Sequence, residues 1–133
     1  MYMSIANNKL KKLISQYRYE SETWKRYLQF IQQENNFLKT RLSQVLQNDT
    51  DIDFLERAEI FQNKFLSEDE TVHLLRQDVH DMEEMLTVNY YETETVPAEL
   101  VKKFKKLSRD METVERQFHK LKTDFNAFVS DAA

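Results

Sequence analysis

The sequence predicts an all-α protein, an antiparallel three-helix coiled-coil bundle of long helices. Two observations carry this prediction. The 133 residues include no glycine and a single proline, Pro97, and glycine is the usual residue of tight hairpin turns, so a β-rich fold is disfavoured. Apolar residues also recur at alternating spacings of four and three over three long stretches, which is the pattern of a coiled-coil seam. The chain, residues 1–133, is most simply one domain.

The first helix is expected over about residues 7–47. Its seam, formed by heptad positions a and d, has nine apolar or aromatic members among eleven; the two polar members are Ser21 and Asn35. The seam is Leu10, Ile14, Tyr17, Ser21, Trp24, Leu28, Ile31, Asn35, Leu38, Leu42 and Val45. Turn-forming residues at 48–51 then supply an N-cap for the next helix.

The second helix is expected over about residues 52–90, with the acidic Glu68 as the one charged member of its seam. An alternative exists, because Ser67 to Glu70 has the Ser-x-x-Glu spacing of a capping box, which would start a new helix after a break at Leu66. We favour one continuous helix, since the heptad phase passes this point without a slip and a loop would normally disturb it.

The third helix is expected over about residues 97–130. Residues 91–96 show no apolar period, and Pro97 suits a first helical turn because its missing N–H would be unpaired there anyway. All nine seam positions of this helix are apolar: Leu100, Phe104, Leu107, Met111, Val114, Phe118, Leu121, Phe125 and Phe128. The short connections predict that neighbouring helices run antiparallel.

The charge pattern agrees with this folding. Residues 48–94 contain 14 acidic and three basic residues, a net charge of −11, whereas residues 1–47 and 95–133 carry +5 and +2. An acidic helix between two basic ones favours attraction between neighbours. The lysines that open the first and third helices and the acidic end of the second should meet at one end of the bundle.

Two polar seam residues predict a polar layer at mid-bundle. Folding the first helix onto the second places Asn35 near Lys64 and Glu68, with Glu68 reaching Lys122 or water. Such residues often fix the register of a coiled coil at some cost in stability. We therefore interpret the layer as a register device in preference to a ligand site.

Enzymatic and metal chemistry find little support in the sequence. The chain has no cysteine and no glycine for a phosphate-binding loop. Glu70-x-x-His73 has the spacing used by di-iron carboxylate proteins, but the heptad phase puts Glu70 at position f and all three histidines, His73, His80 and His119, at position b, on the outer face. We expect no catalytic residues, no metal and no cofactor.

Nucleic-acid and membrane binding are also unlikely on charge and hydropathy. The lysine run over residues 102–106 could bind phosphate, but a net charge of −4 and a pI near 5.4 oppose nucleic acid. We expect these lysines to pair with the acidic end of the second helix. The chain has no run of 18 apolar residues, and its first residues do not resemble a signal peptide, so the expected location is the cytoplasm.

Apolar residues outside the seams indicate a protein-interaction surface. In the first helix these residues occupy positions g and c, and in the second helix position c. They are Tyr27, Phe30, Phe37, Ile60, Leu74 and Val88. We expect a non-enzymatic scaffold or adaptor that acts through protein–protein contacts, as a homodimer formed through the outer face of the first two helices. The alternatives are a different protein on that face, a small acidic helical chaperone for a partner protein, or a nucleic-acid-associated protein.

Overall fold

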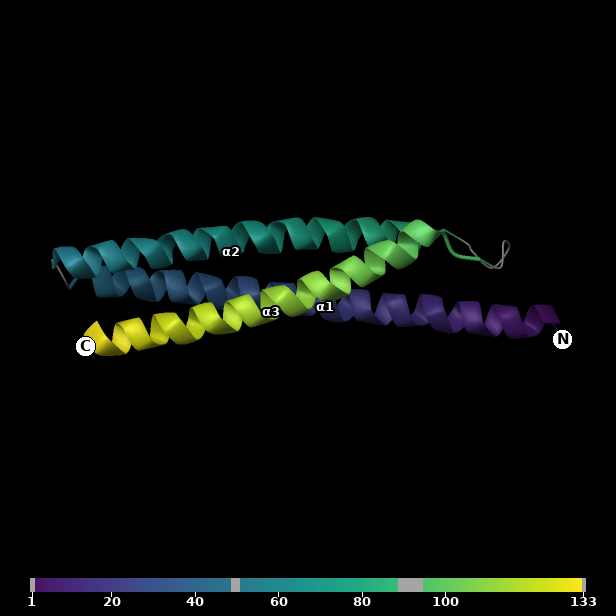
Figure 1. Ribbon diagram of the computed structural model, residues 1–133, viewed down its shortest axis with the longest axis horizontal. Helices are drawn as coiled ribbons and strands as arrows, with labels where there is room; N and C mark the ends of the chain where they lie inside the picture. The colour runs from purple at the N-terminus through teal and green to yellow at the C-terminus, as the bar shows by residue number, and fades with distance from the viewer. Residues whose placement is uncertain (1, 49–50, 89–94, 133) are drawn as a thin grey trace.

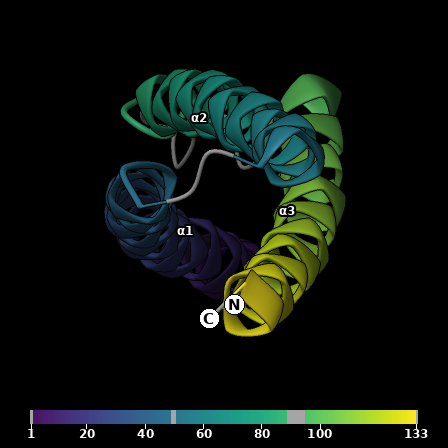
Figure 2. The same cartoon turned by 90° about the vertical axis from the view of Figure 1, so that its left-hand side faces the viewer.

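The computed structural model describes residues 2–48, 51–88 and 95–132, and these residues form three long α-helices. The helices are α1 (Tyr2–Leu46), α2 (Ile52–Met85) and α3 (Ala98–Ala132). They pack as a bundle in which α2 runs antiparallel to α1 and α3, while α3 lies obliquely to the other two (Figure 1). Each helix contacts both others, as the view along the bundle suggests (Figure 2). The predicted fold class is confirmed.

The helix α2 ends at Met85, earlier than the predicted end near residue 90. The seam explains the difference, because after Leu86 the next heptad position d falls on Asn89, so no apolar burial would reward further turns. Positions 89 and 90 of the predicted helix, and 91–94 of the predicted connection, lie outside the described residues. The other predicted bounds are close, although α1 begins at Tyr2 rather than near residue 7.

Hydrogen bonds replace the helical pattern at the end of α2. The hydroxyl Oγ1 of Thr87 donates to the carbonyl oxygen of Glu84 at 2.6 Å. The guanidinium Nη2 of Arg18, on α1, donates to the carbonyl oxygen of Leu86 at 3.0 Å. The carbonyl of Glu84 also accepts the backbone N–H of Thr87 at 3.2 Å. Carbonyl groups at a helix C-terminus lack intrahelical partners, and Arg18 supplies a donor to that of Leu86.

The helix α2 is continuous through Ser67, so the alternative of a break after Leu66 is wrong. Phe65 and Val72, on either side of this point, are both buried in the core. The hydroxyl of Thr71 donates to the carbonyl of Ser67 at 3.1 Å, four residues back, as it does within a regular helix. The uninterrupted burial of the seam outweighs the local capping signal.

The starts of α2 and α3 follow the prediction in part, since Asp51 is the N-cap without a side-chain capping hydrogen bond, and Pro97 lies one residue before α3 and not in its first turn. Asp51 occupies the N-cap of α2 with extended backbone (φ −65°, ψ 129°), and its carbonyl accepts the first helical bond, from the N–H of Leu55 at 2.9 Å. Pro97 precedes α3, and its carbonyl accepts the N–H of Leu100 at 3.1 Å. Proline stands where no backbone N–H is required.

The core is built from the three seams. Almost every predicted seam residue is buried, and the exceptions Val45, Phe61 and Phe104 are partly buried against the core. Phenylalanines from α2 and α3 cluster at the end of the bundle near the α1–α2 connection. Phe65 and Phe125, both 0% exposed, pack edge to face with ring centroids 5.1 Å apart.

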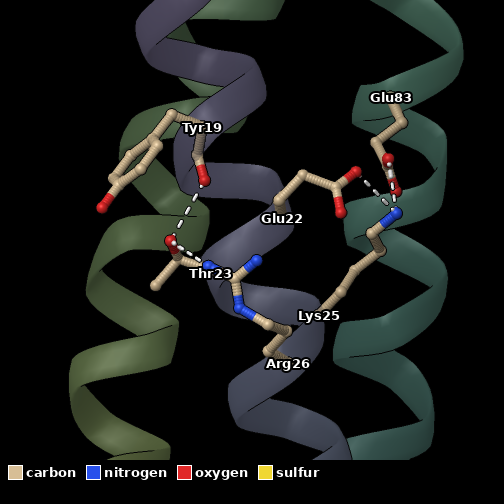
Figure 3. Close-up of polar contacts among 6 residues, drawn as sticks. All are labelled: Tyr19, Glu22, Thr23, Lys25, Arg26 and Glu83. Atoms are coloured by element: carbon tan, nitrogen blue, oxygen red, sulfur yellow. Dashed lines mark hydrogen bonds and ion pairs between the residues drawn. The ribbon is translucent and has the colours of Figure 1, made fainter.

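Ion pairs between helices confirm part of the predicted charge arrangement. Lys25 of α1 reaches Glu83 of α2 at 3.0 Å (Figure 3). Lys103 of α3 lies 4.0 Å from Asp81 of α2. Lys106, by contrast, pairs with Asp110 within its own helix at 2.7 Å. Exposed pairs contribute only about 0–1 kcal/mol each, so the apolar seams hold the bundle and the charges favour this arrangement of neighbours.

Replacing Phe125 by alanine should lower the free energy of unfolding by about 3–5 kcal/mol, because the truncation leaves a cavity among fully buried aromatic rings. The measurement is urea unfolding followed by circular dichroism. The control is Leu66→Ala, at an exposed site on α2, which should change the same quantity by less than about 1 kcal/mol. Equal losses in the two variants would contradict the described core.

Candidate protein-interaction surface

Large apolar side chains remain exposed on two of the three helices. On α1 these are Tyr19, Phe30 and Phe37; on α2 they are Ile52, Leu55, Ile60, Leu66 and Leu74; and Val88 lies just after α2. Among the described residues of α3, no large apolar side chain is comparably exposed. Single exposed apolar residues are normal, whereas neighbouring ones that form a patch indicate a binding surface. Five of the six residues predicted for the interaction surface are in this exposed set.

Tyr27, the sixth predicted residue, is partly buried and packs against the core. Burial raises the pKa of its hydroxyl, and the negative charges of Glu115 and Glu68 raise it further. The ring of Tyr27 lies 6.1 Å, centroid to centroid, from that of Phe30. Tyr27 therefore connects the core to the exposed rings beyond it, and we call Tyr27, Phe30 and Phe37 together the α1 aromatic stripe.

The cross-helix ion pairs show which side of α1 carries this stripe. Lys25, at heptad position e, pairs with α2, whereas Glu34, at position g, accepts from Nζ of Lys122 on α3 at 3.4 Å. Residues four apart on a helix are surface neighbours, so positions c and g adjoin. Phe30 and Phe37, both at c, therefore lie on the side of α1 that faces α3.

The predicted residues of α2 lie on a different side of the bundle. Leu74 lines a groove of about 270 Å³ between α2 and α3, with Lys106 and Thr113 of α3 across from it. Ile60 shares the heptad position of Leu74. Val88 follows the end of α2 and is not part of its helical face. The helix α3 thus stands between the residues predicted on α1 and those predicted on α2.

A second groove, the α1–α3 groove, lies beside the α1 aromatic stripe and has a volume of about 460 Å³. Its apolar lining is Trp24, Tyr27, Phe104 and Met111, and its carboxylates are Glu20, Glu112 and Glu115. The ring of Phe104 stacks on Tyr17 at 4.0 Å and lies 5.2 Å from that of Trp24. The groove is therefore aromatic at its base and acidic around it.

The sequence analysis missed this groove, because its parts come from two helices that are remote in the chain. Taken alone, each of these glutamates occupies a non-seam heptad position. Heptad positions could have indicated the groove. Positions g and e adjoin when two helices run parallel, and Tyr27 is at g of α1 while Glu115 is at e of α3. The rim of the groove on α1 includes Thr23, whose hydroxyl donates to the carbonyl of Tyr19 at 3.1 Å (Figure 3).

The mid-bundle polar layer is present with different partners from those predicted. The amide Nδ2 of Asn35 donates to the backbone carbonyl of Phe65 at 2.9 Å and to Oδ1 of Asp69 at 2.7 Å. Lys39 also pairs with Asp69. The partners of Asn35 are thus each one residue further along α2 than the predicted Lys64 and Glu68. A side-chain bond to the backbone of the facing helix is well suited to fix the offset between α1 and α2.

Glu68 does not make the predicted contact with Lys122. Lys122 pairs with Glu34 instead, and Oε1 of Glu68 accepts no hydrogen bond from the described residues. Glu68 is only 7% exposed. Burial raises the pKa of this carboxyl, and the negative charge of Asp69 adds to the effect. An ionised Glu68 therefore destabilises the folded chain at neutral pH.

The residues with metal-binding or catalytic potential do not form a site in the described part of the chain. Glu70, His73, His80 and His119 are all exposed. Nε2 of His80 lies 3.1 Å from the carboxylate of Glu84 in the same helix. Over residues 2–48, 51–88 and 95–132, no three histidine, aspartate or glutamate side chains converge on a possible metal position.

Comparison with known proteins gives no family and no relative. The chain matches no family model, no curated protein and no solved structure. Within its described residues, none of the helices has a stretch apolar and long enough to cross a bilayer. Any functional assignment therefore depends on the surfaces described above.

Glu68→Gln should raise the free energy of unfolding at about pH 7 by roughly 1–3 kcal/mol, because it removes a buried negative charge, one of whose oxygens has no hydrogen bond within the described residues. The folded pKa of Glu68 is raised, so the destabilisation is present above that pKa and disappears as the pH falls through it. The advantage of the variant should therefore shrink on acidification.

The measurement is chemical unfolding of both proteins at several pH values between about 7 and 5. Glu70→Gln, two residues away at an exposed site, serves as the control and should change stability by less than about 0.5 kcal/mol. A Glu68→Gln variant that is less stable than the native chain at neutral pH would show that the carboxylate has a stabilising partner.

Proposed function

We propose that this chain is a non-enzymatic helical scaffold or adaptor that acts through protein–protein contacts and self-associates as a homodimer. The observation that carries the proposal is the α1 aromatic stripe. Phe30 is 48% exposed and Phe37 is 61% exposed, one heptad apart on one side of α1, and the ring of Tyr27 lies next to Phe30. The two exposed rings, with Gln33 and Glu34, line a shallow hollow of about 350 Å³.

The energy of apolar burial supports this proposal. Full burial of a phenylalanine side chain contributes about 1.5–3 kcal/mol relative to leaving it in water. Because Phe30 and Phe37 are 48% and 61% exposed, burying the rest of both rings offers a partner about 2–3 kcal/mol without any change in the fold of the monomer. Aromatic residues are also enriched at the centres of interfaces.

The charge of the same surface favours a protein partner over nucleic acid. Three glutamates line the adjoining α1–α3 groove, and they would repel a phosphate backbone. Lys103, one of the lysines that could bind phosphate, is near Asp81. The chain has no cysteine, so its association requires no disulfide and is compatible with a reducing compartment such as the cytoplasm.

Phe30→Glu combined with Phe37→Glu should convert the dimer to a monomer, because the two carboxylates would have to be desolvated at the interface. The measurement is sedimentation velocity at micromolar concentration, with circular dichroism to show that the helices remain. The matched control is Ile52→Glu with Leu66→Glu, which places the same charge at two apolar sites on α2 that are 70% and 53% exposed. The control should remain a dimer.

Two results would overturn this proposal. One is a native chain that sediments as a monomer throughout the micromolar range. The other is a dimer that both double variants leave intact, since the stripe would then contribute nothing to association.

A further inference from the structure

We infer that the α1–α3 groove receives Phe37 and Arg41 of a second copy of this chain, so that two copies pair through antiparallel α1 helices. The inference rests on the proposed self-association and adds to it the residues that meet. The occupant is a second copy because α1 itself carries an apolar ring and a cation that complement the acidic groove. A two-fold axis between two copies brings these side chains to the groove.

The groove offers an apolar base together with excess negative charge. Trp24, Tyr27 and Phe104 line it. Its carboxylates, on Glu20, Glu112 and Glu115, form no ion pair within the described residues. Arg26 reaches the α1 side of the groove, where its Nη2 donates to the hydroxyl of Thr23 at 3.4 Å (Figure 3). The lining residues themselves include three carboxylates and no lysine or arginine, so the groove suits an apolar group accompanied by a cation.

Phe37 and Arg41 form such a pair on α1. They are four residues apart, so both side chains project from one side of the helix. Both are exposed, and Arg41 forms no ion pair with the described part of the chain. An aromatic ring and a guanidinium are the side chains most often found to dominate binding energy at interfaces. A guanidinium is also attracted to the faces of aromatic rings such as those in the groove.

The spacing along α1 matches a two-fold axis. In a symmetric dimer each copy uses the same surface, and the contacts occur twice. If the axis passes beside the peptide bond between Phe30 and Ile31, an antiparallel pair of α1 helices sets Arg41 of one copy level with Glu20 of the other. The same axis sets Phe37 level with Trp24, which lines the groove. The Phe30 rings of the two copies then meet at the centre.

The basic segment at the start of α3 is a poorer occupant. The lysine run over residues 102–106 contains one apolar ring, that of Phe104, and this ring already packs against Tyr17 and Trp24. The run can supply charge to an acidic groove but no free apolar anchor. Charge and apolar burial together therefore select the Phe37–Arg41 pair.

The first test exchanges charges between the groove and its occupant. Arg41→Glu alone and Glu20→Arg alone should each weaken dimerisation at least about tenfold, because like charges then face each other across the interface. The chain that carries both substitutions should recover most of the native affinity. The measurement is the dimer dissociation constant from sedimentation over a concentration series. Lys120→Glu, at an exposed site of α3 on the side that faces α2, is the control and should leave the constant unchanged.

The second test uses the absence of native cysteine. A chain with Phe30→Cys should form a disulfide-linked dimer on mild oxidation, because the axis brings the two copies of that position together. The control is Tyr19→Cys, at a more exposed site. The axis places residue 19 of one copy far from residue 19 of the other, so this variant should remain uncrosslinked. Non-reducing electrophoresis reads out both.

The outcomes separate this inference from the proposed function. A native chain that is monomeric, or that binds only a different protein through the groove, overturns both. A native dimer that tolerates Arg41→Glu, gains nothing from the paired exchange and crosslinks no better at position 30 than at position 19 overturns this pairing and leaves self-association intact.

Discussion

The structure depends on the burial of one apolar stripe along each helix. Helices of 34 to 45 residues in this chain are about 50–70 Å long, and neither their hydrogen bonds nor their helix propensity would hold them in place in water. They are stable only where the three seams meet. Because the heptad phase is maintained in every helix, the heptad position of each residue outside the seams determines on which side of its helix that residue lies. Ion pairs, grooves and exposed rings all follow from that phase.

The contacts of Asn35 show how an apolar seam acquires one alignment among several. Apolar side chains can pack against each other in more than one register. An amide that must donate to a particular carbonyl can do so in only one register. The bond from Asn35 to the carbonyl of Phe65 favours one offset between α1 and α2. Glu68, next in sequence to Asp69 of that network, shows the corresponding cost, since its buried carboxylate has an oxygen without a hydrogen bond within the described residues.

The helices and their seams could be predicted from the sequence, because a period repeated over many turns is a signal that local exceptions do not erase. The capping-box signal at Ser67 is such an exception, and the structure overrides it. Pairwise contacts were less predictable. Heptad phase determines which residues face a neighbour, but it does not decide whether Lys122 of α3 reaches Glu68 of α2 or Glu34 of α1.

The candidate surface was predictable in part for the same reason. Exposure of Phe30 and Phe37 follows from their heptad position, which sequence alone supplies. The α1–α3 groove does not follow, because it depends on how the oblique path of α3 sets its side chains against those of α1. The early end of α2 could in principle have been predicted, because the seam position that follows Leu86 is the polar Asn89.

The parallel relation of α1 and α3 has a consequence for the order in which the bundle assembles. The helices α1 and α2, and likewise α2 and α3, are consecutive in the chain, so each pair can form as a helical hairpin. The contact between α1 and α3 joins segments about 90 residues apart, such as Glu34 and Lys122, and has no turn of its own from which to start. It closes last and, by the same reasoning, opens first. The α1–α3 groove therefore lies between the two helices whose contact closes last and opens first.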